Sequence, residues 1–284
     1  MCADAIVAAA VLLDLDGVLY VAGEPVPGAP AAVAALRDLG LRLRLVTNTT
    51  AHSRGETIAK LRRLGFAVAD EEVITPAALA VAHCRARGHR RVALLVADAV
   101  KEDLAGLDEV TGEAGADAVI VGDLGASFGY EPLNRAFRLL MDGAELVALQ
   151  HNRFWRTADG LSLDAGAFVA ALEYAAGVPA FVVGKPAAGF FASVLDGLAL
   201  PPAAAVMVGD DVEVDVGGAL DAGLAAVLVR TGKYREDRVR ASGITPTATV
   251  GSIADVPRLL QPGAGAAGRA NPAGHQSPVR RSST

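Results

Sequence analysis

The chain has 284 residues, roughly two domains' worth, and 52 % of them are apolar, enough for a sizeable core. Its net charge of −6 argues against a nucleic-acid-binding protein, because such proteins carry a basic surface. Charged residues make up 20 % of the chain, too few for a disordered protein. The two cysteines, Cys2 and Cys84, form neither a disulfide framework nor a CxxC metal motif. Composition therefore favours a two-domain enzyme of the reducing cytoplasm.

The first elements alternate between strand and helix. Residues 5–13 are apolar, but no basic residue precedes them and Asp14 and Asp16 follow, so we expect a buried strand over 7–15 and no signal peptide. No stretch reaches the about 20 apolar residues that a membrane span needs. The pattern then predicts a helix over 30–39, a strand over 41–46 and a helix over 53–64.

A second series of elements follows a good helix start at Thr75 and Pro76. The expected elements are a helix to residue 87, strands over 92–97, 118–122 and 146–150, and helices over 133–141 and 168–176. Strands are then expected over 180–186, 203–211 and 225–232, with helices between them. This alternation predicts an α/β fold with a Rossmann-like, doubly wound parallel sheet.

Composition and element order divide the chain into three parts. We expect a discontinuous core made of residues 1–75 and 181–260, with an α/β module at 76–180 inserted into it. Residues 261–284 are rich in glycine and proline and hold three arginines and no acid, so we expect a disordered tail. This tail carries a net charge of +3, so residues 1–260 carry −9 and the whole chain carries −6.

Polar residues follow the apolar strands at four places. The carboxyl ends of parallel strands meet at one edge of an α/β sheet, so these residues are expected to lie together. They are Asp14 and Asp16 in DLDGV, Thr47 and Asn48 in TNTT, Lys185 in GKP, and Asp210, Asp211 and Asp215 in GDDVEVD.

These residue types suit phosphoryl transfer. Asp14, Asp16 and Asp210 would concentrate negative charge that Mg²⁺ with oxygen ligands neutralises. Lys185 offers a point charge for a phosphate, and the Thr47 hydroxyl can hold phosphate oxygens near a helix N-terminus. A carboxylate on a metal can attack a facing phosphate, which predicts an aspartyl-phosphate that water hydrolyses.

The segments DLDGV, TNTT, VGKP and VGDDVEVDVGGA, in this order, resemble the four motifs of the haloacid dehalogenase superfamily. The likeness covers residues 11–260, and phrases such as EPLNRAFRLLMDGA and VLVRTGKYRED narrow it to one branch. This resemblance implies that residues 76–180 are the large α/β cap, of the C2 type, inserted between the second and third motifs. It also implies a homodimer through the cap.

The resemblance assigns a role to each motif residue. Asp14 would be the nucleophile and a Mg²⁺ ligand, and Asp16 the general acid/base, with its backbone carbonyl on the metal. Thr47 and Asn48 would bind the phosphoryl group, and Lys185 would neutralise charge between nucleophile and phosphate.

The remaining candidates complete the metal site and the substrate side. Asp210 would be the third metal ligand, and Asp211 and Asp215 would lie beside the metal or cap the next helix. Three residues follow a predicted cap strand, at a position where relatives place substrate-selecting residues: His151, Asn152 and Arg153. The alternative for these residues is a plain surface turn.

Two other classes of protein compete with a phosphatase. A receiver-like signalling domain also places aspartates, a threonine and a lysine at strand ends, but it needs only about half this length and no inserted module. A catalytically silent binding or regulatory protein could keep the same fold, although every motif residue is present here. We expect a small phosphorylated metabolite as substrate, because a large cap covers a small site; no motif identifies which metabolite.

Overall fold

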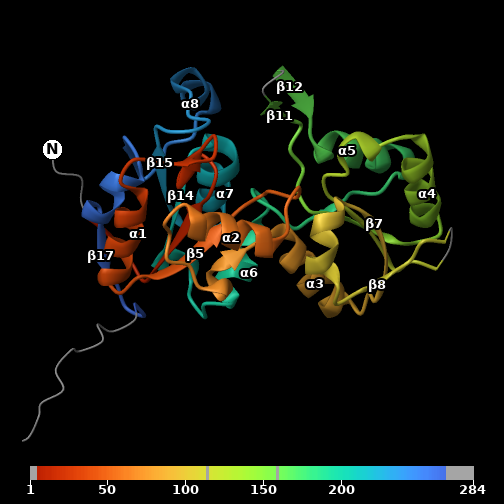
Figure 1. Ribbon diagram of the computed structural model, residues 1–284, viewed down its shortest axis with the longest axis horizontal. Coiled ribbons are helices and arrows are strands. Elements are labelled where there is room, and N and C mark those ends of the chain that lie inside the picture. The colour runs from red at the N-terminus through yellow and green to blue at the C-terminus, as the bar shows by residue number, and fades with distance from the viewer. Residues whose placement is uncertain (1–4, 113–114, 158–159, 267–284) are drawn as a thin grey trace, which may run out of the picture.

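The computed structural model describes residues 5–112, 115–157 and 160–266, which form two α/β lobes side by side (Figure 1). The first lobe is built on a sheet of six parallel strands in the order β16-β15-β14-β2-β5-β6, which we call the core sheet. Its strands are β2 (Ala10–Asp14), β5 (Arg42–Val46), β6 (Val73–Ile74), β14 (Ala205–Gly209), β15 (Ala225–Val229) and β16 (Ala248–Val250).

Helices cover both faces of the core sheet because its strands are apolar on both sides. In β2, Val11 and Leu13 pack with Leu36 in one hydrophobic cluster, whereas Leu12 packs with Phe190 in another. The helices of the first face are α1 (Ala29–Asp38), α2 (Arg54–Arg63) and the 3-10 helix at Ile253–Arg258; those of the second are α6 (Ala188–Asp196), the π-helical turn Val212–Gly217 and α7 (Gly218–Asp221). This is the doubly wound arrangement that the alternation of elements predicts.

The second lobe has its own parallel sheet, in the order β13-β10-β9-β7-β8, which we call the cap sheet. Its strands are β7 (Arg91–Leu95), β8 (Asp108–Glu109), β9 (Ala118–Val121), β10 (Glu145–Ala148) and β13 (Phe181–Val182). One face packs against α3 (Pro76–Arg87) and the 3-10 helix Asp98–Leu104, and the other against α4 (Tyr130–Met141) and α5 (Ala165–Ala176). Cys84 is fully buried on the first of these faces, as expected for a core residue.

Smaller elements project from the two lobes. The hairpin of β11 (Phe154–Thr157) and β12 (Gly160–Leu163) extends from the second lobe, and α8 (Glu236–Ser242) extends from the first at the same end of the molecule (Figure 1). A second hairpin, of β3 (Tyr20–Val21) and β4 (Glu24–Pro25), follows β2 directly. The remaining 3-10 turns lie at Asp70–Glu72, Gly125–Ser127 and Pro202–Ala204.

Local capping fixes the helix starts that the sequence predicts. Ser53 accepts a hydrogen bond from the backbone N of Glu56 at 3.1 Å, and the Glu56 carboxylate accepts one from Ser53 N at 3.1 Å. Thr75 caps α3 in front of Pro76. Both capping interactions join residues three apart in the chain, which is why sequence patterns locate both starts.

The expected strand over 7–15 is instead two strands. Residues Ile6–Ala8 form β1, which pairs in parallel with β17 (Leu260–Pro262), and β2 begins at Ala10 in the core sheet. At Ala9 the backbone N donates to the carbonyl of Ala204 at 2.7 Å, where the chain passes from one pairing to the other. The apolar run is continuous, so only the distant pairing partners reveal the break.

Two expected boundaries also shift. The strand expected over 180–186 is confined to β13, and Phe181 pairs with Val147, so this strand belongs to the cap sheet and not to the core. The predicted disordered tail was to begin at 261, whereas β17 runs to Pro262 and Gly263 N donates to the carbonyl of Ala8 at 2.6 Å. The rest of that prediction, from residue 267 on, lies outside the described residues.

No helix in the described part of the chain is long and apolar enough to cross a membrane.

A charged cluster ties α3 to the cap sheet. His89 Nε2 lies 2.7 Å and His83 Nε2 3.2 Å from Glu145 Oε2, and the His83 ring stacks on Phe181 with ring centroids 3.7 Å apart. Burial raises the pKa of Glu145, but the hydrogen bonds from His89 and His83 outweigh it and hold the pKa below its ordinary value. The ionised carboxylate therefore stabilises the folded state.

We expect the Glu145→Gln variant to unfold at a lower temperature than the parent at pH 7, because its free energy of unfolding falls by about 1 kcal/mol. Because the pKa of Glu145 is lowered on folding, its contribution is present above the ordinary carboxyl pKa and is lost as the pH falls through the lowered value. Thermal unfolding followed by circular dichroism between pH 3 and 7 should show the two curves converging at the acidic end. Exposed Glu131, changed to Gln, is the control, and a gap of equal size at pH 3 and pH 7 would contradict the argument.

Candidate active site

The predicted residues meet at the carboxyl edge of the core sheet. Asp14 is the last residue of β2, Thr47 follows β5, and Asp210 follows β14, so the parallel register brings all three to one edge. Lys185 reaches this edge from the segment that leaves the cap sheet. All four side chains are buried.

Lys185 is the centre of the buried charge cluster. Its ammonium donates to Oδ1 of Asp14 and, at 2.6 Å, to Oδ1 of Asp215. Burial alone would lower the pKa of Lys185, but the charges of the two aspartates outweigh it and raise the pKa above its ordinary value. Lys185 is therefore a permanent cation at this edge of the sheet.

The side-chain amide of Asn48 fixes the backbone of Lys185. Asn48 Nδ2 donates to the carbonyl of Lys185 at 2.8 Å, and its Oδ1 accepts from Lys185 N at 2.9 Å. The predicted phosphoryl-binding amide thus makes two hydrogen bonds with protein backbone. Thr47 lies next to it, and its hydroxyl oxygen accepts from the backbone N of Thr49 at 3.0 Å.

Three carboxylates share the cluster with a single buried lysine. Oxygens of Asp14, Asp210 and Asp215 all lie within 4.8 Å of one another. Burial and then the neighbouring aspartates raise the pKa of Asp210 to about 8, and burial raises the pKa of Asp14 to about 6 although Lys185 opposes it. Asp210 Oδ1 is buried with no hydrogen-bond partner. A divalent cation with oxygen ligands fits this set because it would neutralise the excess charge and coordinate that oxygen.

Residues 231–233 hold Asp210 in place; they lie in the phrase VLVRTGKYRED of the resemblance, but the sequence assigned them no role. Lys233 N donates to Asp210 Oδ2 at 2.6 Å, and the Thr231 hydroxyl donates to the carbonyl of Gly17. Gly17 has φ +91° and Gly232 φ +59°, and a Cβ on either would overlap Asp210 Oδ2. A further signal is their place after β15, at the same edge of the sheet as the motifs.

Asp16 differs from Asp14 in its environment. It lies on the loop between β2 and β3, where its backbone bridges to Tyr20, and its side chain is exposed. Asp14 by contrast is buried against Lys185. Two carboxylates one residue apart therefore face different surroundings, one desolvated and one in contact with solvent.

The structure separates Asp211 from Asp215, which the sequence left undecided. Asp211 accepts hydrogen bonds from the backbone N atoms of Glu213 and Val214, each at 3.1 Å, so it caps the helical turn that follows. Asp215 lies in the carboxylate cluster, and its Oδ2 accepts from Asp211 N at 3.2 Å. One residue is a cap and the other a member of the cluster.

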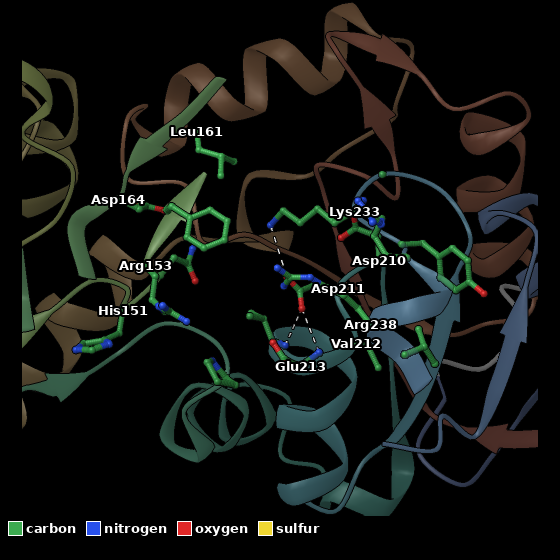
Figure 2. A pocket seen from close by; sticks show the side chains of 18 residues that line it. His151, Arg153, Leu161, Asp164, Asp210, Asp211, Val212, Glu213, Lys233 and Arg238 are labelled. Atoms are coloured by element: carbon green, nitrogen blue, oxygen red, sulfur yellow. Dashed lines mark hydrogen bonds and ion pairs between the residues drawn. The ribbon is translucent and has the colours of Figure 1, made fainter. Parts of the chain in front are cut away.

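A cavity of about 630 Å³ opens between the lobes and reaches Asp210 (Figure 2). Its far side is formed by the segment before β11 and by the hairpin, and there the three predicted cap residues line it: His151, Asn152 and Arg153. His151 Nε2 also lies 3.2 Å from Glu173 Oε2 on α5, and the carbonyl of Asn152 accepts from Gly166 N at 3.0 Å. These three residues thus lie on the cap side of the cavity that Asp210 reaches from the core.

Comparison with known proteins agrees with this geometry. A family model described as haloacid dehalogenase-like hydrolase matches residues 11–108, and a second model of HAD-hydrolase-like proteins matches residues 182–256. The chain is 43 % identical over 226 residues to haloacid dehalogenase-like hydrolase domain-containing protein 2 of Homo sapiens, covering 80 % of this chain and 85 % of that protein. It is 39 % identical over 258 residues to phospholysine phosphohistidine inorganic pyrophosphate phosphatase of Xenopus laevis, covering 88 % and 94 %.

Solved structures show the same architecture. The 4-nitrophenylphosphatase of Thermotoga maritima superimposes with a TM-score of 0.82 at 25 % identity, covering 88 % of this chain and 97 % of that one. Glycerol phosphate phosphatase of Mycobacterium tuberculosis, solved in complex with magnesium, gives a TM-score of 0.77 at 31 % identity, covering 88 % and 76 %. The chain belongs to the haloacid dehalogenase-like hydrolase family, among its phosphohydrolases with an inserted α/β cap.

Proposed function

We propose that this protein is a Mg²⁺-dependent phosphatase that hydrolyses a small phosphorylated substrate through an aspartyl-phosphate on Asp14. The observation that carries the proposal is the buried cluster of Asp14, Asp210 and Asp215 around Lys185, in which Asp210 Oδ1 has no partner. A cluster with this surplus of negative charge is suited to a cation and a phosphate. Names of relatives, such as 4-nitrophenylphosphatase and glycerol phosphate phosphatase, support the same class of reaction.

Asp14, Asp210 and the backbone carbonyl of Asp16 would hold the metal. Asp215 would keep Lys185 in position beside them through its hydrogen bond to the ammonium group. Bound Mg²⁺ neutralises charge on the carboxylates and on the phosphoryl oxygens. Asp211 stays outside, since its carboxylate caps a helical turn.

In the first step Asp14 attacks phosphorus. Lys185 holds Oδ1 of Asp14, which leaves the second oxygen to form the new O–P bond as the bond from phosphorus to the leaving group breaks. Asp16 gives its proton to the leaving group, and its exposed position lets it reach an atom outside the cluster. Lys185 and the Thr47 hydroxyl neutralise and orient the phosphoryl oxygens, and Asn48 keeps Lys185 in position.

In the second step water hydrolyses the aspartyl-phosphate. Asp16, now ionised, removes a proton from water, which attacks phosphorus and releases inorganic phosphate and the free Asp14 carboxylate. The position of Asp16 also separates this proposal from a receiver-like domain, which keeps its phosphate. The large second lobe argues in the same direction, because a receiver needs no inserted sheet.

The strand pairing supports a division of labour between the lobes. Residues 5–75 and 183–266 would form the catalytic core, and residues 76–182 the cap that covers the site. Closing the cap over the cavity would exclude water from the first step. A homodimer through the cap and a cytoplasmic location stay predictions.

Replacing Asp14 by Asn should lower kcat on 4-nitrophenyl phosphate with Mg²⁺ by about 10³-fold or more, because the nucleophile is lost. Release of 4-nitrophenolate measures the rate. Asp38, an exposed carboxylate at the end of α1, gives the matched control Asp38→Asn with parental kcat. Undiminished turnover by the Asp14 variant would refute the mechanism, and a catalytically silent parent would favour the binding-protein alternative.

The Asp16→Asn variant should still form the aspartyl-phosphate on a substrate with a good leaving group but hydrolyse it slowly. Loss of the general base is worth about 10²- to 10⁴-fold. Rapid quenching followed by intact-mass measurement should show a phosphoenzyme that the parent does not accumulate. Fast turnover without any such species would rule out the assigned role of Asp16.

Addition of Mg²⁺ should raise the melting temperature of the parent, because a ligand at about 100 times its dissociation constant stabilises the folded state by about 2.7 kcal/mol. The Asp210→Asn variant should melt no lower than the parent without metal, since it removes a buried charge that two aspartates repel, and it should lose the shift with Mg²⁺. Differential scanning fluorimetry with and without EDTA makes the measurement. An unchanged Mg²⁺ shift in this variant would place the metal elsewhere.

A further inference from the structure

Two arginines line the cavity from opposite lobes. Arg153 lies on the cap side next to β11, and Arg238 lies on α8 of the core (Figure 2). Both side chains are exposed, and among the described residues neither makes a hydrogen bond or an ion pair through its guanidinium. Neighbouring Arg235, by contrast, is paired with Asp237 at 3.1 Å. The cavity therefore has two guanidinium groups that form no ion pair within the described part of the chain, although Asp164, Asp211 and Glu213 also line it.

These arginines are not needed at the carboxylate cluster. The positive charges that act most strongly on Asp14 are Lys185 and Lys233, and the one that acts most strongly on Asp210 is Lys233. The Lys233 ammonium lies 4.0 Å from Asp211 Oδ2, at the cluster end of the cavity. The two arginines thus remain for the part of a substrate that lies away from the phosphoryl group.

The wall near the arginines is partly apolar. On the hairpin, Phe154 is 41 % and Leu161 63 % exposed, and both line the cavity. On the core side Val212, Tyr234 and Val239 line it. An apolar wall with cations on both sides suits a leaving group that has a carbon skeleton and a charged end.

We propose that Arg153 and Arg238 select a substrate whose leaving group carries a second anionic group, a carboxylate or a further phosphate, joined to the reacting phosphate by an apolar portion. This inference rests on the proposed function and names the substrate class of the same site. Guanidinium groups bind such oxygens through paired, charge-assisted hydrogen bonds. Glu213, an exposed acid on the same wall, opposes this selection and offers a test of opposite sign.

A matched set of aryl phosphates tests the proposal with Mg²⁺ present. The probes are 4-carboxyphenyl phosphate, its methyl ester, and hydroquinone bisphosphate. In the methyl ester the para substituent is neutral and the phenol is the better leaving group. A higher kcat/KM for the carboxylate therefore cannot come from leaving-group chemistry. We expect the carboxylate to be preferred by about tenfold or more, as charge-assisted hydrogen bonds allow. Comparing the carboxylate with the bisphosphate then tells which anionic group the site prefers.

Variants assign the preference to residues. Arg238→Met and Arg153→Met should each bring the ratio of kcat/KM for carboxylate over ester toward one, whereas Glu213→Gln should raise it. Arg240→Met is the control, because Arg240 lies on the same helix, is paired with Glu236 and does not line the cavity. Equal kcat/KM for carboxylate and ester in the parent, or a ratio that the arginine variants leave unchanged, would overturn the inference but leave the phosphatase standing. Absence of turnover on all three probes would overturn both.

Discussion

The site depends on one buried ammonium group shared by two carboxylates. Lys185 loses its hydration in a place where Asp14 and Asp215 replace water, and removal of either partner would leave a charge without compensation. The lysine is carried by the segment that leaves the cap sheet, and Asn48 fixes its backbone from the end of β5. The cluster can therefore form only when the segments on either side of the inserted lobe have come together.

The same bridge leaves the cluster short of positive charge. Lys185 meets Asp14 and Asp215 but not Asp210, whose Oδ2 is held by a backbone N–H and whose Oδ1 has no partner. Burial of an unpaired carboxylate opposes folding, and it persists here because the Gly17 loop and β14 place it there. A cation bound at Asp210 would offset this cost, which links the charge of the protein alone to the chemistry proposed for the complex.

Sequence patterns predicted what depends on local structure. Short-range rules locate the cap of α2 at Ser53 and the polar residues after β2, β5 and β14. The order of the motifs then indicated the family and the role of each motif residue. The break at Ala9 could not be predicted, because both halves of the run are equally apolar and differ only in the strands they pair with. The role of Thr231 was missed for the same reason, since its partner Gly17 is distant in sequence and the contact exists only in the folded chain.

The residues proposed for substrate choice also depend on contacts between distant parts of the chain. The sequence pointed to Arg153 as a candidate substrate-selecting residue but gave no sign of Arg238, and nothing in their local context relates one to the other. The fold places them across one cavity because the hairpin and α8 extend from different lobes toward the same end of the molecule. The reacting phosphate, by contrast, is met by buried residues whose motifs are visible in the chain. The residues proposed for the chemistry therefore lie in strand-end motifs of the core, whereas those proposed for selectivity lie where the two lobes face each other.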